Sequence, residues 1–145
     1  MIARIRKSIN EKDQGFTLIE LLVVMIIIGI LAAIAIPIFM NQRKKAVDSS
    51  AVSDVSTLGK EVATYYVDAD AASTVAVDNT GGRYLVNSVD VGKASDPTWT
   101  PTITFNPAAG ETNSQAWCVT LPYSGGTNSA VAYSAKNGLS KTGVC

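Results

Sequence analysis

The stretch LLVVMIIIGILAAIAI at Leu21–Ile36 decides the fold of this chain, because it contains no polar side chain. Extended outward to residues 16–40, the run is interrupted only by Thr17, Glu20 and Pro37. About 20 apolar residues suffice to cross the hydrocarbon core of a bilayer as a helix, whereas the apolar part of a removed secretory signal has about 7 to 15. Residues 16–40 are therefore predicted to form a transmembrane helix.

After this run the pattern becomes amphipathic. Apolar side chains recur every three or four positions, at Val47, Ala51, Val55, Leu58, Val62 and Tyr65 or Tyr66. This spacing is typical of one face of an α-helix, and the acidic residues Asp48 and Asp54 are expected on other faces. We therefore predict one continuous helix over about residues 16–67, roughly 80 Å long.

Gly29 and Pro37 weaken this helix locally. Glycine costs about 1 kcal/mol relative to alanine, and proline removes a backbone hydrogen bond that lipid cannot replace. Both residues are tolerated in membrane spans where neighbouring helices cover the freed backbone groups. We predict a kink here, either as a place where the helix loosens on leaving the membrane or as the routine bend of a single span.

Beyond Asp70 the chain reads as short strands separated by Gly, Asn and Pro turns. Val, Thr, Tyr and Trp concentrate in four candidate strands, Tyr84–Val91, Thr102–Phe105, Ala116–Leu121 and Ala130–Ala135. Neither the amphipathic helix nor a small sheet can bury its apolar face alone. The predicted fold class is α+β, with the second half of the long helix packed on a small antiparallel sheet.

Cys118 and Cys145 are the only cysteines, and they show no CxxC or Cys/His spacing. This pattern favours one structural disulfide over a metal or redox site, and a disulfide requires an oxidising, exported location. The positive-inside rule leaves the orientation open, because four basic residues precede the span and three, at 43–45, follow it. The cysteines favour a carboxyl-terminal part outside the cell.

The charge pattern and the absence of histidine exclude several classes of function. Without histidine the chain lacks the commonest general base and the commonest metal ligand, so we predict no enzyme, no metal site and no cofactor. From Val47 onward nine acidic residues face five basic ones. This balance does not support a nucleic-acid-binding domain, although loop lysines such as Lys136 and Lys141 allow weak contacts.

Glu20 places a carboxylate inside the apolar run. Burying it in hydrocarbon costs at least a few kcal/mol unless it is neutralised or paired, so an intramembrane glutamate indicates a function. The alternative is that Glu20 lies at the lipid interface as the polar end of an ordinary anchor. The run alone does not decide between these interpretations.

The segment GFTLIELLVV at residues 15–24 resembles the cleavage and methylation motif of type IV prepilins. It combines a short charged leader ending in Gly15, a Phe start at Phe16, Glu20 as the fifth residue thereafter, an unbroken apolar stretch, and Pro37 at its far end. The resemblance covers the leader and about the first 50 residues that follow it. Residues 39–48 and 64–68 also look like pilins of actinobacteria.

This resemblance implies a role for each matching residue. Residues 1–15 would be a leader removed by prepilin peptidase between Gly15 and Phe16, and the new amino terminus at Phe16 would be N-methylated. The Glu20 carboxylate would attract the terminal amine of a neighbouring subunit during assembly. The loop closed by Cys118 and Cys145 resembles the disulfide region of pilins and would contribute about 3 kcal/mol.

The resemblance further implies a structural subunit of a type IV pilus, with a span at residues 16–40 and a globular head at 41–145. Such a subunit is a single-pass membrane protein before assembly and part of an extracellular helical homopolymer afterwards, serving adhesion, motility or DNA uptake. Its partners would be the peptidase, the assembly platform and its motor ATPases. The alternatives are a pseudopilin of a type II secretion system and a DNA-receptor pilin of competence.

Overall fold

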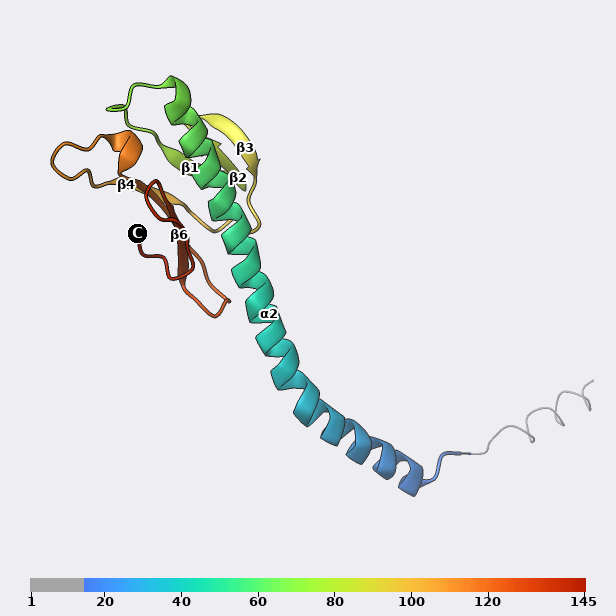
Figure 1. Ribbon diagram of the computed structural model, residues 1–145. Helices are drawn as coiled ribbons and strands as arrows, with labels where there is room; N and C mark the ends of the chain where they lie inside the picture. The colour runs from blue at the N-terminus through green and yellow to red at the C-terminus, as the bar shows by residue number, and fades with distance from the viewer. Residues whose placement is uncertain (1–14) are drawn as a thin grey trace, which may run out of the picture. The chain divides into compact units, whose positions relative to one another are not determined.

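The computed structural model describes residues 15–145, so all of the predicted leader (residues 1–15) except Gly15 lies outside the described part (Figure 1). The chain divides into two compact units, one ending at Met40 and one comprising Asn41–Cys145. Within residues 15–145 one long helix is followed by two antiparallel sheets, which confirms the predicted α+β class.

Helix α2 spans Leu18–Asp68, close to the predicted range of 16–67. Its apolar half is long and apolar enough to cross a membrane, judged by length and composition. The large side chains of this half, from Leu18 to Met40, are between 45% and 80% exposed within the chain. A helix that is apolar all round is stable only where something else covers it.

The first sheet corrects one prediction, because Tyr84–Val91 is not a single strand. The sheet has the order β1 (Val77–Thr80), β2 (Arg83–Val86) and β3 (Val89–Lys93), all antiparallel. The chain reverses between β2 and β3 at Asn87 and Ser88, whose φ angles are 48° and 68°. Positive φ at both central residues makes the tight two-residue turn that suits a twisted hairpin.

The second sheet has the order β4 (Thr102–Phe105), β5 (Trp117–Pro122), β6 (Ala130–Ser134) and β7 (Gly138–Ser140). The three strands predicted here are confirmed to within a residue at each end. The short strands β1 and β7 were not predicted, and two sheets replace the single sheet expected. A one-turn helix, η1 (Asn113–Gln115), precedes β5.

The core of the second unit lies between the second half of α2 and the two sheets (Figure 1). The helix contributes four fully buried side chains, Ala51, Val55, Leu58 and Val62, as the periodicity predicted. The sheets and loops contribute Trp99, Trp117 and Tyr123, each less than 10% exposed. Each large apolar side chain buried in this way stabilises the fold by about 1.5 to 3 kcal/mol.

Asp54 is a correction, because it is buried on α2 and does not lie on a solvent face. Its carboxylate accepts hydrogen bonds from the Tyr84 hydroxyl at 3.0 Å, from the Ser95 amide at 2.9 Å and from the Ser95 hydroxyl at 2.7 Å. A buried carboxylate is tolerated where several donors replace its water. Asp54 therefore fastens the helix to β2 and to the loop after β3.

Removal of the Tyr84 hydroxyl is expected to destabilise the protein. A hydrogen bond to a charged group contributes about 1.5 to 3 kcal/mol, so Tyr84→Phe is predicted to lower the free energy of unfolding by that amount. Denaturant unfolding of the full chain in detergent measures the change. Tyr133→Phe is the matched control, since the Tyr133 hydroxyl makes no hydrogen bond within residues 15–145. Equal stability of the two variants would show that the Tyr84–Asp54 bond contributes little.

Candidate functional site

The predicted cleavage site lies just before α2. Gly15, Phe16 and Thr17 are not helical, all three are exposed, and Phe16 is 83% exposed. The helix begins at Leu18, two residues later than predicted. The peptide bond between Gly15 and Phe16 therefore lies outside the helix.

The later start of α2 is explained by a capping box formed by Thr17 and Glu20. The Thr17 amide and the Thr17 hydroxyl both donate to Oε2 of Glu20 at 2.8 Å, and the Glu20 amide donates to the Thr17 hydroxyl oxygen at 3.3 Å. Side chains of this type satisfy the backbone amides that the first turn of a helix leaves unpaired. Within a single copy, the Glu20 carboxylate thus has partners in its own chain.

This capping box was missed in the sequence analysis, although its signal is present there. Thr17-Leu18-Ile19-Glu20 has the pattern of Ser or Thr followed three positions later by Glu, directly before an apolar run. Helix capping is a third interpretation of Glu20, besides an intramembrane function and the polar end of an anchor at the lipid interface. In a single copy, Glu20 caps its own helix.

Gly29 and Pro37 both lie inside α2. A Cβ atom added at Gly29 would meet nothing within 4 Å, so no contact within residues 15–145 requires glycine there. The role of these two residues as kinks stays a prediction.

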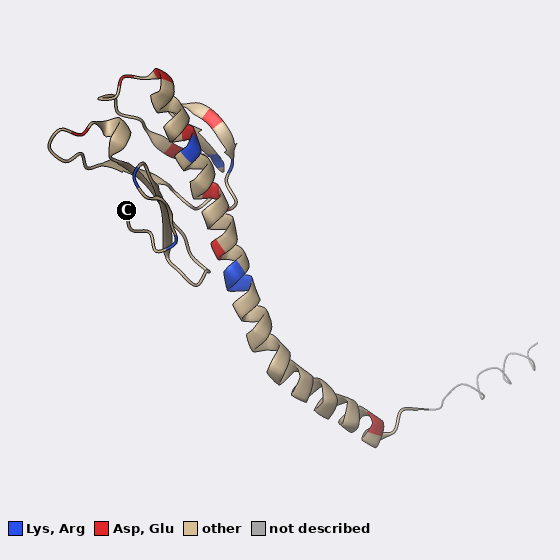
Figure 2. Ribbon diagram, viewed as in Figure 1, with Lys and Arg blue, Asp and Glu red and all other residues tan. Residues whose placement is uncertain are grey.

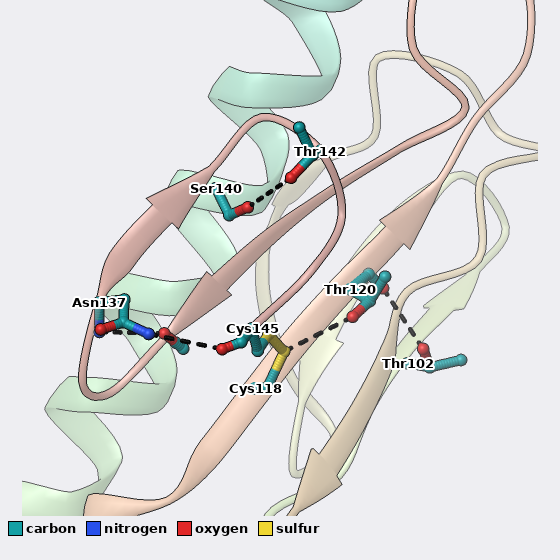
Figure 3. The surroundings of a disulfide bond; sticks show 8 residues. Thr102, Cys118, Thr120, Asn137, Ser140, Thr142 and Cys145 are labelled. Carbon is teal, nitrogen blue, oxygen red and sulfur yellow. Dashed lines mark hydrogen bonds between the residues drawn. A yellow bond between two sulfur atoms is a disulfide. The ribbon is translucent and has the colours of Figure 1, made fainter.

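Cys118 of β5 and Cys145, which follows β7, form a disulfide with their Cα atoms 6.2 Å apart (Figure 3). The bond closes a loop with a sequence separation of 27 residues. Beside it the Asn137 side-chain amide donates to the Cys145 carbonyl at 3.4 Å, and the Cys118 sulfur lies 3.6 Å from the Thr120 hydroxyl. The disulfide holds the segment after β7 against the middle of the second sheet.

A second aspartate of α2, Asp48, binds the loop between β5 and β6. Its Oδ1 accepts hydrogen bonds from the Tyr123 hydroxyl at 2.7 Å and from the Thr127 amide at 2.9 Å. A Cβ atom at Gly126 would collide with the Asp48 carboxylate, so this close approach requires glycine. The loop between β5 and β6 is thereby tied to the beginning of the amphipathic half of α2.

The Tyr123–Asp48 contact predicts a loss of stability at alkaline pH. Burial, and then the hydrogen bond to Asp48, raise the pKa of Tyr123 to about 12 from its ordinary value of 10.0. The unfolded chain therefore releases this proton first, so the contribution of Tyr123 is complete below about pH 10 and is lost as the pH rises through about 12. Between pH 9 and pH 11 the midpoint of thermal unfolding in detergent should fall less for Tyr123→Phe than for the unchanged chain. Equal declines would contradict this assignment.

No group of three His, Cys, Asp or Glu side chains suited to a metal ion occurs within residues 15–145.

Comparison with known proteins supports the predicted resemblance of the amino-terminal region to type IV prepilins. Residues 11–36 match the family model of the prokaryotic N-terminal methylation motif. The type II secretion system core protein G of Escherichia coli (strain K12) is 41% identical over 59 residues, which are 41% of each chain. The type IV major fimbrial protein FimA of Dichelobacter nodosus is 37% identical over 83 residues, 57% of this chain and 53% of its own.

A third relative, the type IV major pilin protein PilE1 of Neisseria gonorrhoeae, is 33% identical over 88 residues, 61% of this chain and 46% of its own. The chain spans about two fifths to one half of the length of these relatives. No solved structure matches.

With a long helix whose first half is apolar, the methylation motif at its start and these relatives, the chain resembles type IV pilins. The similar proteins include pilins, fimbrial proteins and core proteins of type II secretion systems. The predicted resemblance to type IV pilins is thereby confirmed.

Proposed function

We propose that this chain is the structural subunit of a type IV pilus, polymerised into an extracellular helical filament. The observation that carries the proposal is the methylation motif at the start of a helix whose apolar half is exposed within its own chain. Lipid covers such a surface while the subunit is single. In a filament, helices of other copies cover it instead, through a head-to-tail association that does not close.

The proposed maturation divides the chain into a leader, a span and a head. Prepilin peptidase removes residues 1–15, and Phe16 becomes an N-methylated amino terminus. Residues 16–40 then anchor the subunit in the membrane and later form the filament core, and residues 41–145 form the head outside the cell. The exposed, non-helical backbone at Gly15 and Phe16 supports this assignment.

In assembly, Glu20 exchanges one partner for another. In a single copy its carboxylate accepts from Thr17, as the distances of 2.8 Å show. In the filament it attracts the positively charged amine at Phe16 of a neighbouring copy. Such an attraction between opposite charges is stronger in a low-dielectric surrounding than in water.

A pilus is favoured over a type II secretion system by the length of the similarity. The matches to FimA, PilE1 and the fimbrial protein EcpC of Eikenella corrodens extend over 83 to 91 residues, whereas those to the secretion core proteins of Escherichia coli and Pectobacterium carotovorum end after 57 to 59. The disulfide between Cys118 and Cys145 also favours a pilus. A competence pilin that receives DNA is disfavoured by the excess of acidic over basic residues from Val47 onward.

The remaining partners follow from this function. Before assembly the subunit contacts the membrane and an inner-membrane assembly platform driven by motor ATPases. No catalytic role is assigned to any residue of the chain, and adhesion, motility and DNA uptake are all compatible with a filament of this kind.

Electron microscopy of a strain that lacks this protein tests the proposal. Surface filaments should vanish and should return when the unchanged chain is supplied. Filaments that persist at the normal number would overturn the proposal for a major subunit. If filaments persist and secreted proteins accumulate inside the cell, the pseudopilin alternative is favoured.

A further inference from the structure

The carboxyl-terminal end of α2 and the β2–β3 hairpin enclose an open groove of about 470 Å³. Apolar side chains make up much of its lining, together with the polar Thr64 and Asn87, and two carboxylates line it from the helix. The floor includes Val86, Val89 and Val91, of which Val89 is 65% exposed. Glu61 and Asp68 are both exposed and take part in no ion pair within residues 15–145. We call this surface the acidic groove.

The chemistry of the acidic groove defines what it can bind. An anion is repelled by the two carboxylates, and a purely apolar segment would remove them from water without replacing their hydrogen bonds. A long basic side chain can contact both the apolar part and the acidic part of the groove. Its methylene stem covers the valine floor and its cationic head reaches the carboxylates.

The chain carries a matching surface at the other end of the helical part of its head. Arg43, Lys44 and Lys45 are consecutive and exposed, and we call them the basic triplet. Within residues 15–145 the ion pairs are Arg83–Asp90 and Lys136–Glu111, so none involves the triplet. Figure 2 shows the triplet as a blue band on α2 and acidic positions where α2 ends.

The basic triplet cannot reach the acidic groove of its own chain. Lys44 and Asp68 belong to the same helix, and 24 residues at 1.5 Å each separate them by about 36 Å. A basic triplet that occupies the groove must therefore belong to another molecule. A second copy of this chain supplies the required charge at a fixed position.

We propose that the basic triplet of one copy docks in the acidic groove of a second copy. The proposal rests on the proposed function as a filament subunit and names the contact between heads. Because the two surfaces differ and lie at opposite ends of the helix segment 41–68, the contact is head-to-tail and leaves a free groove and a free triplet for the next copies. Opposite charges at each contact select this register over others.

Charge reversal with compensation tests the contact in the full chain. Lys44→Glu and Asp68→Lys are each expected to cause loss of most surface filaments, since each places like charges together. The chain with both changes is expected to regain filaments. Immunoblots of membrane fractions should show equal amounts of inserted subunit in every strain, since both residues are exposed.

Cross-linking of filaments made by the unchanged chain provides a second measurement. A zero-length carbodiimide reagent joins an amine to a carboxylate only in direct contact. Mass spectrometry is expected to find Lys44 or Lys45 joined to Glu61 or Asp68. Because about 36 Å separates Lys44 from Asp68 within one helix, that linked peptide must connect two copies.

The outcomes separate this proposal from the function on which it rests. If the unchanged chain forms filaments but the double change restores none and no linked peptide is found, the docking proposal is overturned and the subunit function stands. Normal filaments with Asp68→Lys, together with weaker binding of the Lys44→Glu chain to vesicles containing anionic phospholipid, would identify the triplet as a membrane anchor and overturn the docking. Absence of filaments from the unchanged chain would overturn both.

Discussion

Glu20→Gln is expected to leave membrane-inserted subunits and no filaments when this chain is the sole pilin expressed. Glutamine still accepts hydrogen bonds from Thr17, so it can cap α2 as the glutamate does. It carries no charge and cannot attract the amine exposed at Phe16. The substitution therefore removes the proposed assembly contact while it keeps the helix start.

Glu20→Ala is the companion variant, because alanine removes both the cap and the charge. It is expected to lose filaments to the same extent as Glu20→Gln, with a further loss of about 1 kcal/mol of helix stability from the missing cap. Electron microscopy counts the filaments, and immunoblots of membrane fractions give the amount of subunit. Normal piliation of Glu20→Gln combined with a defect of Glu20→Ala would show that Glu20 acts as a helix cap alone.

Cys118→Ser is expected to cause the largest loss of stability in the head. The disulfide closes a loop of 27 residues, and the chain-entropy model assigns about 3 kcal/mol to a loop of this length. A small domain has only about 5 to 15 kcal/mol in total, so this is a large share. Thermal unfolding of the full chain in detergent should show a lower midpoint for Cys118→Ser and for Cys145→Ser.

Two comparisons control this experiment. Cys118→Ser with Cys145→Ser should be no more destabilised than either single change, because one bond is lost in each case. Treatment of the unchanged chain with a reductant should lower its midpoint to a similar value. A midpoint that stays unchanged after reduction would contradict a stabilising role of the bond.

Regular patterns of apolar residues predicted the amphipathic half of α2 and three of the strands correctly. The 3.6-residue period over residues 47–65 predicted the buried face of α2, and β-branched and aromatic runs predicted β4, β5 and β6. The hairpin at residues 83–93 was mistaken for one strand because its turn consists of Asn87 and Ser88. Glycine, the usual marker of positive φ, is absent from these two positions.

Such patterns could not predict the contacts of Asp48 and Asp54. Periodicity assigns a polar residue to the solvent, whereas Asp54 is buried by donors 30 and 41 residues away, on Tyr84 and Ser95. Asp48 likewise meets Tyr123, which is 75 residues away. Only the folded chain brings these groups together. The capping box of Thr17 and Glu20, by contrast, is local and was predictable.

The central claim is that the chain matures into a filament subunit whose amino terminus is Phe16. Mass spectrometry of intact protein from sheared surface filaments tests it most directly. We predict a chain that begins at Phe16, carries one additional methyl group on its terminal amine and retains the disulfide between Cys118 and Cys145. Filaments built from a chain that still begins at Met1, or surface filaments that lack this protein altogether, would contradict the claim.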